Sequence, residues 1–184
     1  MTSQSRPLSS EELEAGLPDI RQSPADDGVI ELIVSRPAVN ERVVQEVAKL
    51  DIAEGLVGDC WCRNDKNPET QLTLMNSRLI ALVAGDRTHW PLAGDQFYVD
   101  LDLSDENLPP GMQVEIGPAV IEITSEPHLG CRKFANRYGK PAMQFVNSDE
   151  GKRLRLRGVN AKVVRSGTVR VGDAVRKAIA SARN

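Results

Sequence analysis

The sequence of 184 residues contains few cysteines and no long apolar run. No stretch approaches the ~20 apolar residues that cross a bilayer, and the N-terminus MTSQSRPLSSEELEAG lacks the charged-then-apolar order of a secretory signal. Three cysteines cannot all pair within one chain, and Cys60 and Cys62 are too close in sequence to make good disulfide partners. We therefore expect free thiols and a cytoplasmic protein.

Neither charge sign is in large excess. The formal net charge is −3, so no global basic field drives binding to nucleic acid or to an anionic membrane. With 40% hydrophobic and 27% charged residues, the composition is typical of a single globular domain. The G-x-x-x-x-G-K-[ST], G-x-G-x-x-G, H-E-x-x-H and G-x-S-x-G motifs are absent. Composition and spacing alone thus leave the function undecided.

The chain divides into a polar start, a β-rich body and a short end. Residues 1–28 are polar and proline-containing, which predicts a tail or a draped arm. Within them only residues 10–17 favour a short helix, with Ser10 as its cap. We predict one mainly β domain over residues 29–177 and a fraying tail over residues 178–184.

Local patterns indicate many short strands and a few short helices. A helix is predicted to begin with Asn76 or the following serine as its cap and to end at Gly85. Gly117 and Pro118 separate two strands of a hairpin. One or two short helices fit residues 131–145. The predicted strands cover residues 29–37, 41–51, 96–104, the two halves of 106–127, 153–158, 159–167 and 168–177. The last three runs are spaced by glycines, which suggests a barrel or a folded-over sheet.

Cys131 is the main candidate for a reactive group. It lies between a predicted strand and a helix start, and Arg132 and Lys133 follow it. A helix dipole and two cations favour thiolate over thiol, and Gly130 leaves room for close approach. The alternative is a small residue buried where the helix begins. His128 is a candidate base or orienting partner, or simply a partly exposed polar residue.

Cys60 and Cys62, together with His89 and His128, raise the question of a zinc site. Their C-x-C spacing departs from the C-x₂₋₄-C of common structural sites, and no second pair follows. We predict no zinc site.

Asp59 and an arginine stripe each have two interpretations. Asp59 either holds its own turn or reaches into a pocket. Arg153, Arg155 and Arg157 alternate in RLRLRG and would share one face of a strand, where they either bind phosphate or carboxylate groups or form a solvated face.

Several short motifs follow one another along the chain: GLVGDCW at 55–61, TQLTLMNSRLIAL at 70–82, LAGDQFYVDLDLSDENLPPG at 92–111, IGPAVIEIT at 116–124, GC at 130–131, RGVNAKVVRSG at 157–167 and VGDAV at 171–175. Their order resembles the MOSC domain, the domain that ends molybdenum cofactor sulfurases, over roughly residues 29–177. Each motif is weak alone, but the set in this order is specific. Two positions depart from the family pattern: Trp61 replaces a frequent histidine, and Gly130 precedes the cysteine in place of proline.

The resemblance implies a β-barrel-like fold with short helices. It also implies functional roles for Gly58, Asp59, Gln71 and Asn107, and it makes Cys131 the residue that carries sulfur. In the large sulfurases a separate pyridoxal phosphate domain mobilises sulfur from cysteine. This chain has no room for that domain, so we expect no pyridoxal phosphate in it. A cysteine desulfurase or a molybdoenzyme is the implied partner.

These observations lead to one hypothesis of function. A pocket formed by residues 55–64, the Asn107 region and the Cys131 helix start would receive a pterin-type molybdenum cofactor or another sulfur acceptor. The Cys131 thiolate would carry or transfer sulfur. Further candidate contacts to the cofactor and its phosphate are Arg132, Lys133, Arg157, Gln71 and Asn76.

Two alternatives stay open. The first is a noncatalytic module that binds a cofactor or a partner without forming a covalent sulfur intermediate. The second is a molybdenum-dependent reductase of N-oxygenated compounds, as in the MOSC-containing amidoxime reductases, in which Cys131 would ligate the metal.

Overall fold

The computed structural model describes residues 6–64 and 67–178. The helices are α1 Ser10–Ile20, α2 Trp61–Asn64, α3 Ser77–Ala84, α4 Arg132–Tyr138, α5 Lys140–Asn147 and α6 Asp149–Arg153, with 3₁₀ turns at Pro68–Thr70 and Arg87–Ala93. The strands are β1 Gly28–Ser35, β2 Val43–Gln45, β3 Val47–Asp51, β4 Gly55–Leu56, β5 Leu72–Asn76, β6 Phe97–Asp100, β7 Gln113–Ile116, β8 Ala119–Ile123, β9 Val159–Arg165, β10 Gly167–Arg170 and β11 Ala174–Lys177.

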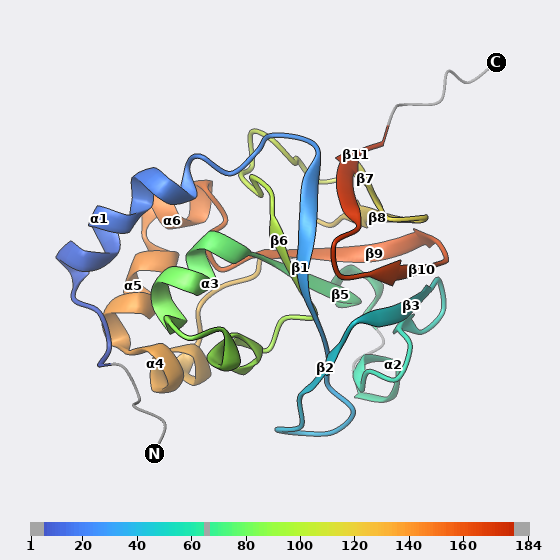
Figure 1. The fold of residues 1–184 in the computed structure, drawn as a ribbon, viewed down its shortest axis with the longest axis horizontal. Helices are drawn as coiled ribbons and strands as arrows, with labels where there is room; N and C mark the ends of the chain where they lie inside the picture. The colour runs from blue at the N-terminus through green and yellow to red at the C-terminus, as the bar shows by residue number, and fades with distance from the viewer. Residues whose placement is uncertain (1–5, 65–66, 179–184) are drawn as a thin grey trace.

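The main sheet closes on itself. Its strand order is β11-β7-β8-β9-β5-β6-β1-β2, and β1 also pairs with β11, which closes a ring of seven strands and leaves β2 at an edge. β5 and β6 run parallel, whereas their neighbouring pairs are antiparallel. A smaller sheet, β10-β3-β4, lies beside the ring. The predicted mainly β, barrel-like fold is therefore confirmed (Figure 1).

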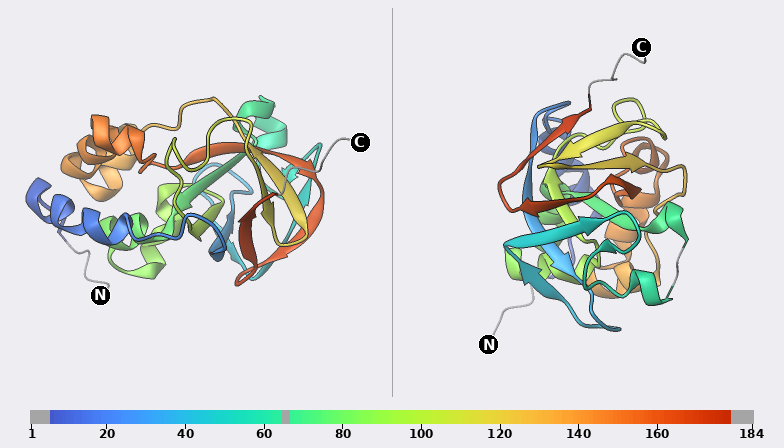
Figure 2. Two further views of the ribbon diagram at one scale, coloured as in Figure 1. Left: turned by 90° about the horizontal axis from the view of Figure 1, so that it is seen from above. Right: turned by 90° about the vertical axis from the view of Figure 1, so that its right-hand side faces the viewer.

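Two apolar cores lie on the two faces of the barrel wall. Strand side chains alternate between faces, so that Ile33 and Phe97 pack inside the ring while Val34 and Tyr98 pack outside it. A bulge between Ile30 and Leu32 shifts the register of β1 against β6. The outer core joins the barrel to α1, α3, α4 and α5, which gather at one end of the molecule (Figure 2).

The N-terminal segment contributes to this outer core. Leu13 of α1 is completely buried there, and α1 contacts α3 and α5. Ser9, rather than the predicted Ser10, is the cap of α1, because its hydroxyl accepts from the Glu12 N–H and the Glu12 carboxylate accepts from the Ser9 N–H. Residues 1–5 and 179–184 of the predicted arm and tail lie outside the described residues.

Several local predictions are confirmed, and one strand is not. Asn76 caps α3, Gly85 ends it, and β7 and β8 form the expected hairpin. RLRLRG does not form a strand: α6 ends at Arg153, and Arg155 has a positive φ of 47°. The N–H of Leu156 donates to the carbonyl of Gly151, so the helix end turns the chain towards β9. The three arginines therefore do not alternate along a strand as predicted.

No helix in the described part of the chain has the length and apolar character needed to span a membrane.

Candidate functional site

Cys131 is the residue that immediately precedes α4, and its side chain is exposed. Partial burial raises the pKa of its thiol, but the nearby backbone N–H groups of Phe134 and Lys133 and the positive charge of Arg157 outweigh this effect. The net result is a pKa below the ordinary cysteine value. The thiolate form is therefore more favourable than in an ordinary cysteine, and the sulfur does not lie in the apolar interior.

The Cys131 side chain opens on a cavity of about 420 Å³, named the thiol cavity here. Cys60 also lines it. Its cationic lining consists of Arg36, Arg42, Lys133, Arg137 and Arg157. None of the described residues that line it is an aspartate or a glutamate. The cavity is therefore suited to an anion.

The cations of the thiol cavity are held in two different ways. Arg36 and Arg157 are paired with the buried carboxylates of Asp59 and Asp95, with closest nitrogen to oxygen distances of 2.9 and 2.7 Å. Arg42 donates instead to the carbonyl of Pro91, 3.2 Å away.

Three of these cations have no neutralising partner within residues 6–64 and 67–178. Among the described residues, Arg42, Lys133 and Arg137 have no carboxylate ion-pair partner, and Arg137 donates to the carbonyl of Leu92. Burial, together with the charges of Arg137 and Arg36, lowers the pKa of Arg42. An anion in the cavity would relieve this repulsion.

Behind the cavity lies a buried cluster of His128, Asp95 and Arg157. His128 Nδ1 is 3.7 Å from Asp95 Oδ1, and Arg157 Nη1 is 2.7 Å from Asp95 Oδ2. Burial, with a smaller contribution from the charge of Arg157, lowers the pKa of His128 to about 4, although Asp95 opposes both effects. The Arg157 guanidinium carbon lies 5.1 Å from the centre of the Phe134 ring. Arg157 is thereby fixed in position beside Cys131.

Gly130 is held by Asn147, the last residue of α5. Its N–H donates to Asn147 Oδ1 and its carbonyl accepts from Asn147 Nδ2, each at 2.8 Å. A Cβ at Gly130 would lie 2.8 Å from Val146 Cγ2, so this position has no space for a side chain. Sequence reasoning missed Asn147, because nothing local links it to a residue 17 positions away.

Some of the predicted site residues come together and others do not. Cys131, Lys133 and Arg157 line the thiol cavity. Cys60 and Trp61, from the predicted pocket loop at residues 55–64, line it as well. Arg132 is exposed and is not among the lining residues.

Asn107 does not come to this cavity. Its amide nitrogen donates to the carbonyls of Ala25 and Asp102, both at 2.8 Å, and its oxygen accepts from Lys177. The expected contribution of the Asn107 region to a pocket around Cys131 is wrong, because this side chain ties the N-terminal segment to β11 instead.

The side-chain amides of Gln71 and Asn76 form hydrogen bonds with other parts of the protein. Gln71 is buried, donates to the Ile52 carbonyl at 2.9 Å and accepts from the Val163 N–H at 2.7 Å. Asn76 is also buried, caps α3 and donates to Ser23 and to the Leu101 carbonyl. Neither lines the thiol cavity.

Gly58 and Asp59 shape the loop that carries Cys60. Gly58 has a φ of +89°, which L side chains rarely adopt. Asp59 is buried and accepts hydrogen bonds from the backbone and guanidinium of Arg36 and from the Trp61 N–H. Asp59 therefore positions Arg36, which lines the cavity.

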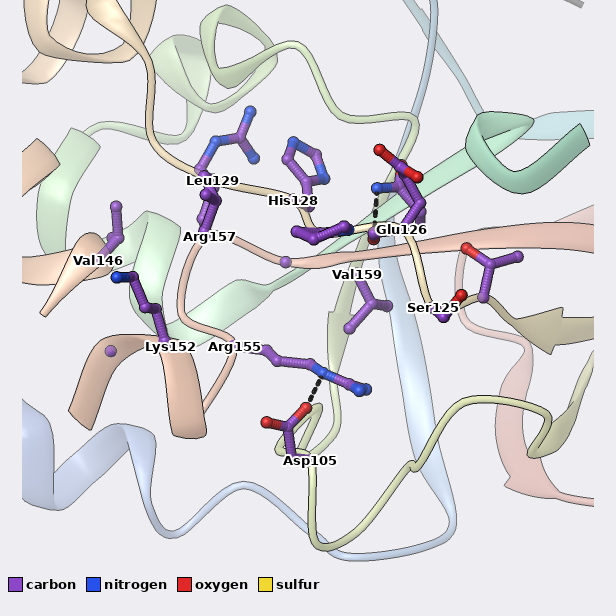
Figure 3. Close-up of a pocket in the computed structure, with 15 residues that line it drawn as sticks. Asp105, Ser125, Glu126, His128, Leu129, Val146, Lys152, Arg155, Arg157 and Val159 are labelled. Atoms are coloured by element: carbon purple, nitrogen blue, oxygen red, sulfur yellow. Dashed lines mark hydrogen bonds and ion pairs between the residues drawn. The ribbon is translucent and has the colours of Figure 1, made fainter. Parts of the chain in front are cut away.

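A second cavity of about 410 Å³ (Figure 3), named the side cavity, shares two lining residues with the thiol cavity. Arg157 and Asn160 line both. His128 and Leu129 line the side cavity, whereas Cys131 lines only the thiol cavity. The predicted pair of His128 and Cys131 is thus divided between two cavities.

Fold and site together define a closed, mixed β-barrel domain with an exposed thiol on a cationic cavity. The chain belongs to the MOSC domain family, whose model matches residues 67–176. No curated protein matches the chain.

Solved structures share the fold at low sequence identity. YuaD from Bacillus subtilis is 19% identical with a TM-score of 0.53, over 80% of this chain and 94% of that one. YiiM from Escherichia coli is 16% identical with a TM-score of 0.55, over 84% and 72%. A hypothetical protein is 17% identical with a TM-score of 0.58, over 85% and 70%.

Proposed function

We propose that this chain carries sulfur on Cys131 and offers it to a pterin-type molybdenum cofactor, or another anionic sulfur acceptor, bound in the thiol cavity. The observation that carries the proposal is the exposed thiol of lowered pKa on a cavity rich in cations. Membership of the MOSC family, which is associated with molybdenum cofactor proteins, adds support.

The lining residues fit such a cofactor. Arg42, Lys133 and Arg137 have no carboxylate partner among the described residues and would hold its phosphate, for which guanidinium groups supply paired donors. When bound, the cofactor would supply a molybdenum centre able to accept sulfur. Arg157 is already paired with Asp95, so it would not bind the phosphate. Its positive charge would instead stabilise the Cys131 thiolate.

Loading of Cys131 requires a persulfide donor. The thiolate attacks the outer sulfur of the donor R–S–SH, a new S–S bond forms at Cys131, and the donor leaves as the thiolate R–S⁻. Protons and electrons balance without an added oxidant. A cysteine desulfurase is the proposed donor, since it supplies the protein-bound persulfide. No proton transfer is assigned to His128, which lines the side cavity.

Mass spectrometry of the whole protein tests the carrier function. After treatment with a small-molecule persulfide donor, wild-type protein should gain the mass of one sulfur atom, mapped to Cys131. Cys131→Ser should lose this adduct, and Cys62→Ser should keep it, because Cys62 is not among the residues that line the cavity. An adduct distributed over all three cysteines would contradict the proposal.

A second measurement distinguishes a Cys131 that carries sulfur from a Cys131 that ligates molybdenum. Molybdenum analysis of freshly purified protein should find no stable metal if Cys131 carries sulfur transiently. Stoichiometric molybdenum that disappears in Cys131→Ser would instead indicate the reductase alternative. Cofactor binding that persists in Cys131→Ser, with no persulfide in the wild type, would indicate the noncatalytic module.

A further inference from the structure

The side cavity has an apolar wall. Leu129 is half exposed on it, although its side chain is large and hydrophobic. Val146 and Val159 contribute buried apolar surface to the same lining. Figure 3 shows Val146 and Leu129 on the side nearest Lys152. Such a wall favours the body of an organic ligand over a bare inorganic ion.

The charges of the side cavity are mostly paired. Arg155 forms an ion pair with Asp105 and donates to the Leu108 carbonyl at 2.6 Å. Glu126 is exposed, and Figure 3 shows it at the opposite end of the cavity from Lys152. In the described part of the chain, Lys152 has no ion-pair partner. Among the described residues, the ammonium of Lys152 at one end of the cavity and the carboxylate of Glu126 at the other are therefore both left without a partner.

Arg157 also lines the side cavity, and Asp95 neutralises its charge. Arg157 is 7% exposed, and its Nε is buried without a hydrogen-bond partner among the described residues. The other nitrogens of this guanidinium are used by Asp95 and the Ala93 carbonyl. A buried donor without an acceptor costs free energy, and this one belongs to a residue that the two cavities share.

We propose that the side cavity binds a small organic monocarboxylate, with its apolar body against Leu129, Val146 and Val159 and its carboxylate towards Lys152. One uncompensated ammonium matches one negative charge. The thiol cavity, by contrast, holds several uncompensated cations and suits a phosphate. The two cavities share Arg157 and Asn160 but have different lysines, and this inference does not depend on the sulfur-carrier function.

Binding of 4-methylpentanoate to the ¹⁵N-labelled full chain tests the inference, with the neutral 4-methylpentanamide as the matched probe. Amide shifts of Gly151, Lys152 and Gly158, which line the cavity, should report saturable binding of the acid. The amide should bind about tenfold more weakly, because it lacks the charge-assisted contact. Equal affinities for the two probes, or no saturable shift with the acid, would overturn the inference.

Variants assign the binding to one cavity. Lys152→Gln should weaken binding of the acid about tenfold and leave the amide unchanged, whereas Lys152→Arg should keep most of the affinity. Lys152 is exposed on α6, so both variants should fold. Lys133→Gln, in the thiol cavity, should have no effect. If Lys133→Gln weakened binding of the acid as much as Lys152→Gln does, the acid would bind in the thiol cavity, and the inference would be wrong. Cys131→Ser should bind the acid normally, which separates this test from that of the sulfur carrier.

Discussion

Asn147 fixes Gly130 through a two-point hydrogen bond, in which one side-chain amide satisfies both the N–H and the carbonyl of the glycine at 2.8 Å. The segment before Cys131 lies between β8 and α4, where no strand or helix satisfies these backbone groups. The Asn147 amide replaces that pairing. The thiol therefore lies on a backbone that α5 holds in place.

We predict that Asn147→Ala lowers both stability and thiol reactivity. Loss of two part-buried hydrogen bonds should reduce the free energy of unfolding by about 2 kcal/mol. The loosened backbone should also move Cys131 away from the N–H groups of Lys133 and Phe134 that stabilise its thiolate. Alkylation of Cys131 at pH 7 should slow, measured with Cys60 and Cys62 replaced by serine. Asn136→Ala, an exposed position on α4, is the matched control and should change neither quantity.

Elements with local signals could be predicted from the sequence. The hairpin depends on Gly117, whose φ of 53° allows the turn between β7 and β8. The start of α3 depends on Asn76, which caps it. The alternation of residues 153–158 could not be interpreted locally, because buried contacts of Leu156 and Arg157 outweigh the strand pattern.

The site could be predicted only in part. Cys131 carries a local signal, since its neighbours and the following helix are adjacent in sequence. Arg36, Arg42 and Arg137 reach the thiol cavity only because the barrel closes and α4 packs beside it. Asn107 illustrates the reverse case: a polar residue in a family motif turned out to hydrogen-bond the N-terminal segment.

The pH dependence of alkylation measures the state of the Cys131 thiol directly. Its pKa in the folded protein lies below the ordinary value, so thiolate should form at lower pH than in the unfolded chain. The iodoacetamide rate of a protein whose only cysteine is Cys131 should rise with a midpoint below that measured in urea. A folded midpoint equal to or above the unfolded one would refute the assigned environment.

His128 should make the protein sensitive to mild acid. Its pKa falls from 6.5 to about 4 on folding, chiefly because it is buried, so the unfolded state binds more protons between these values. Stability should therefore fall as the pH decreases from 6.5 to 4, by about 3 kcal/mol in total. His128→Gln should flatten this slope. Urea unfolding at a series of pH values checks it, and an unchanged slope in the variant would show that His128 titrates normally.

Removal of the Asp59 carboxylate should cost far more than removal of an exposed one. Asp59 accepts four hydrogen bonds, three from Arg36 and one from the Trp61 N–H, and it neutralises a guanidinium that is largely buried. Asp59→Ala leaves that charge without its partner, which should destabilise the fold by about 3 kcal/mol or more.

Two further variants separate charge from shape. Asp59→Asn keeps an acceptor for Trp61 and should lose less stability than Asp59→Ala. Asp19→Ala removes an exposed carboxylate 3.6 Å from Arg78 and should cost less than about 1 kcal/mol. Urea unfolding of the three variants gives the comparison. If Asp59→Ala were as stable as Asp19→Ala, Asp59 would not anchor Arg36, and its carboxylate would instead be available to a ligand.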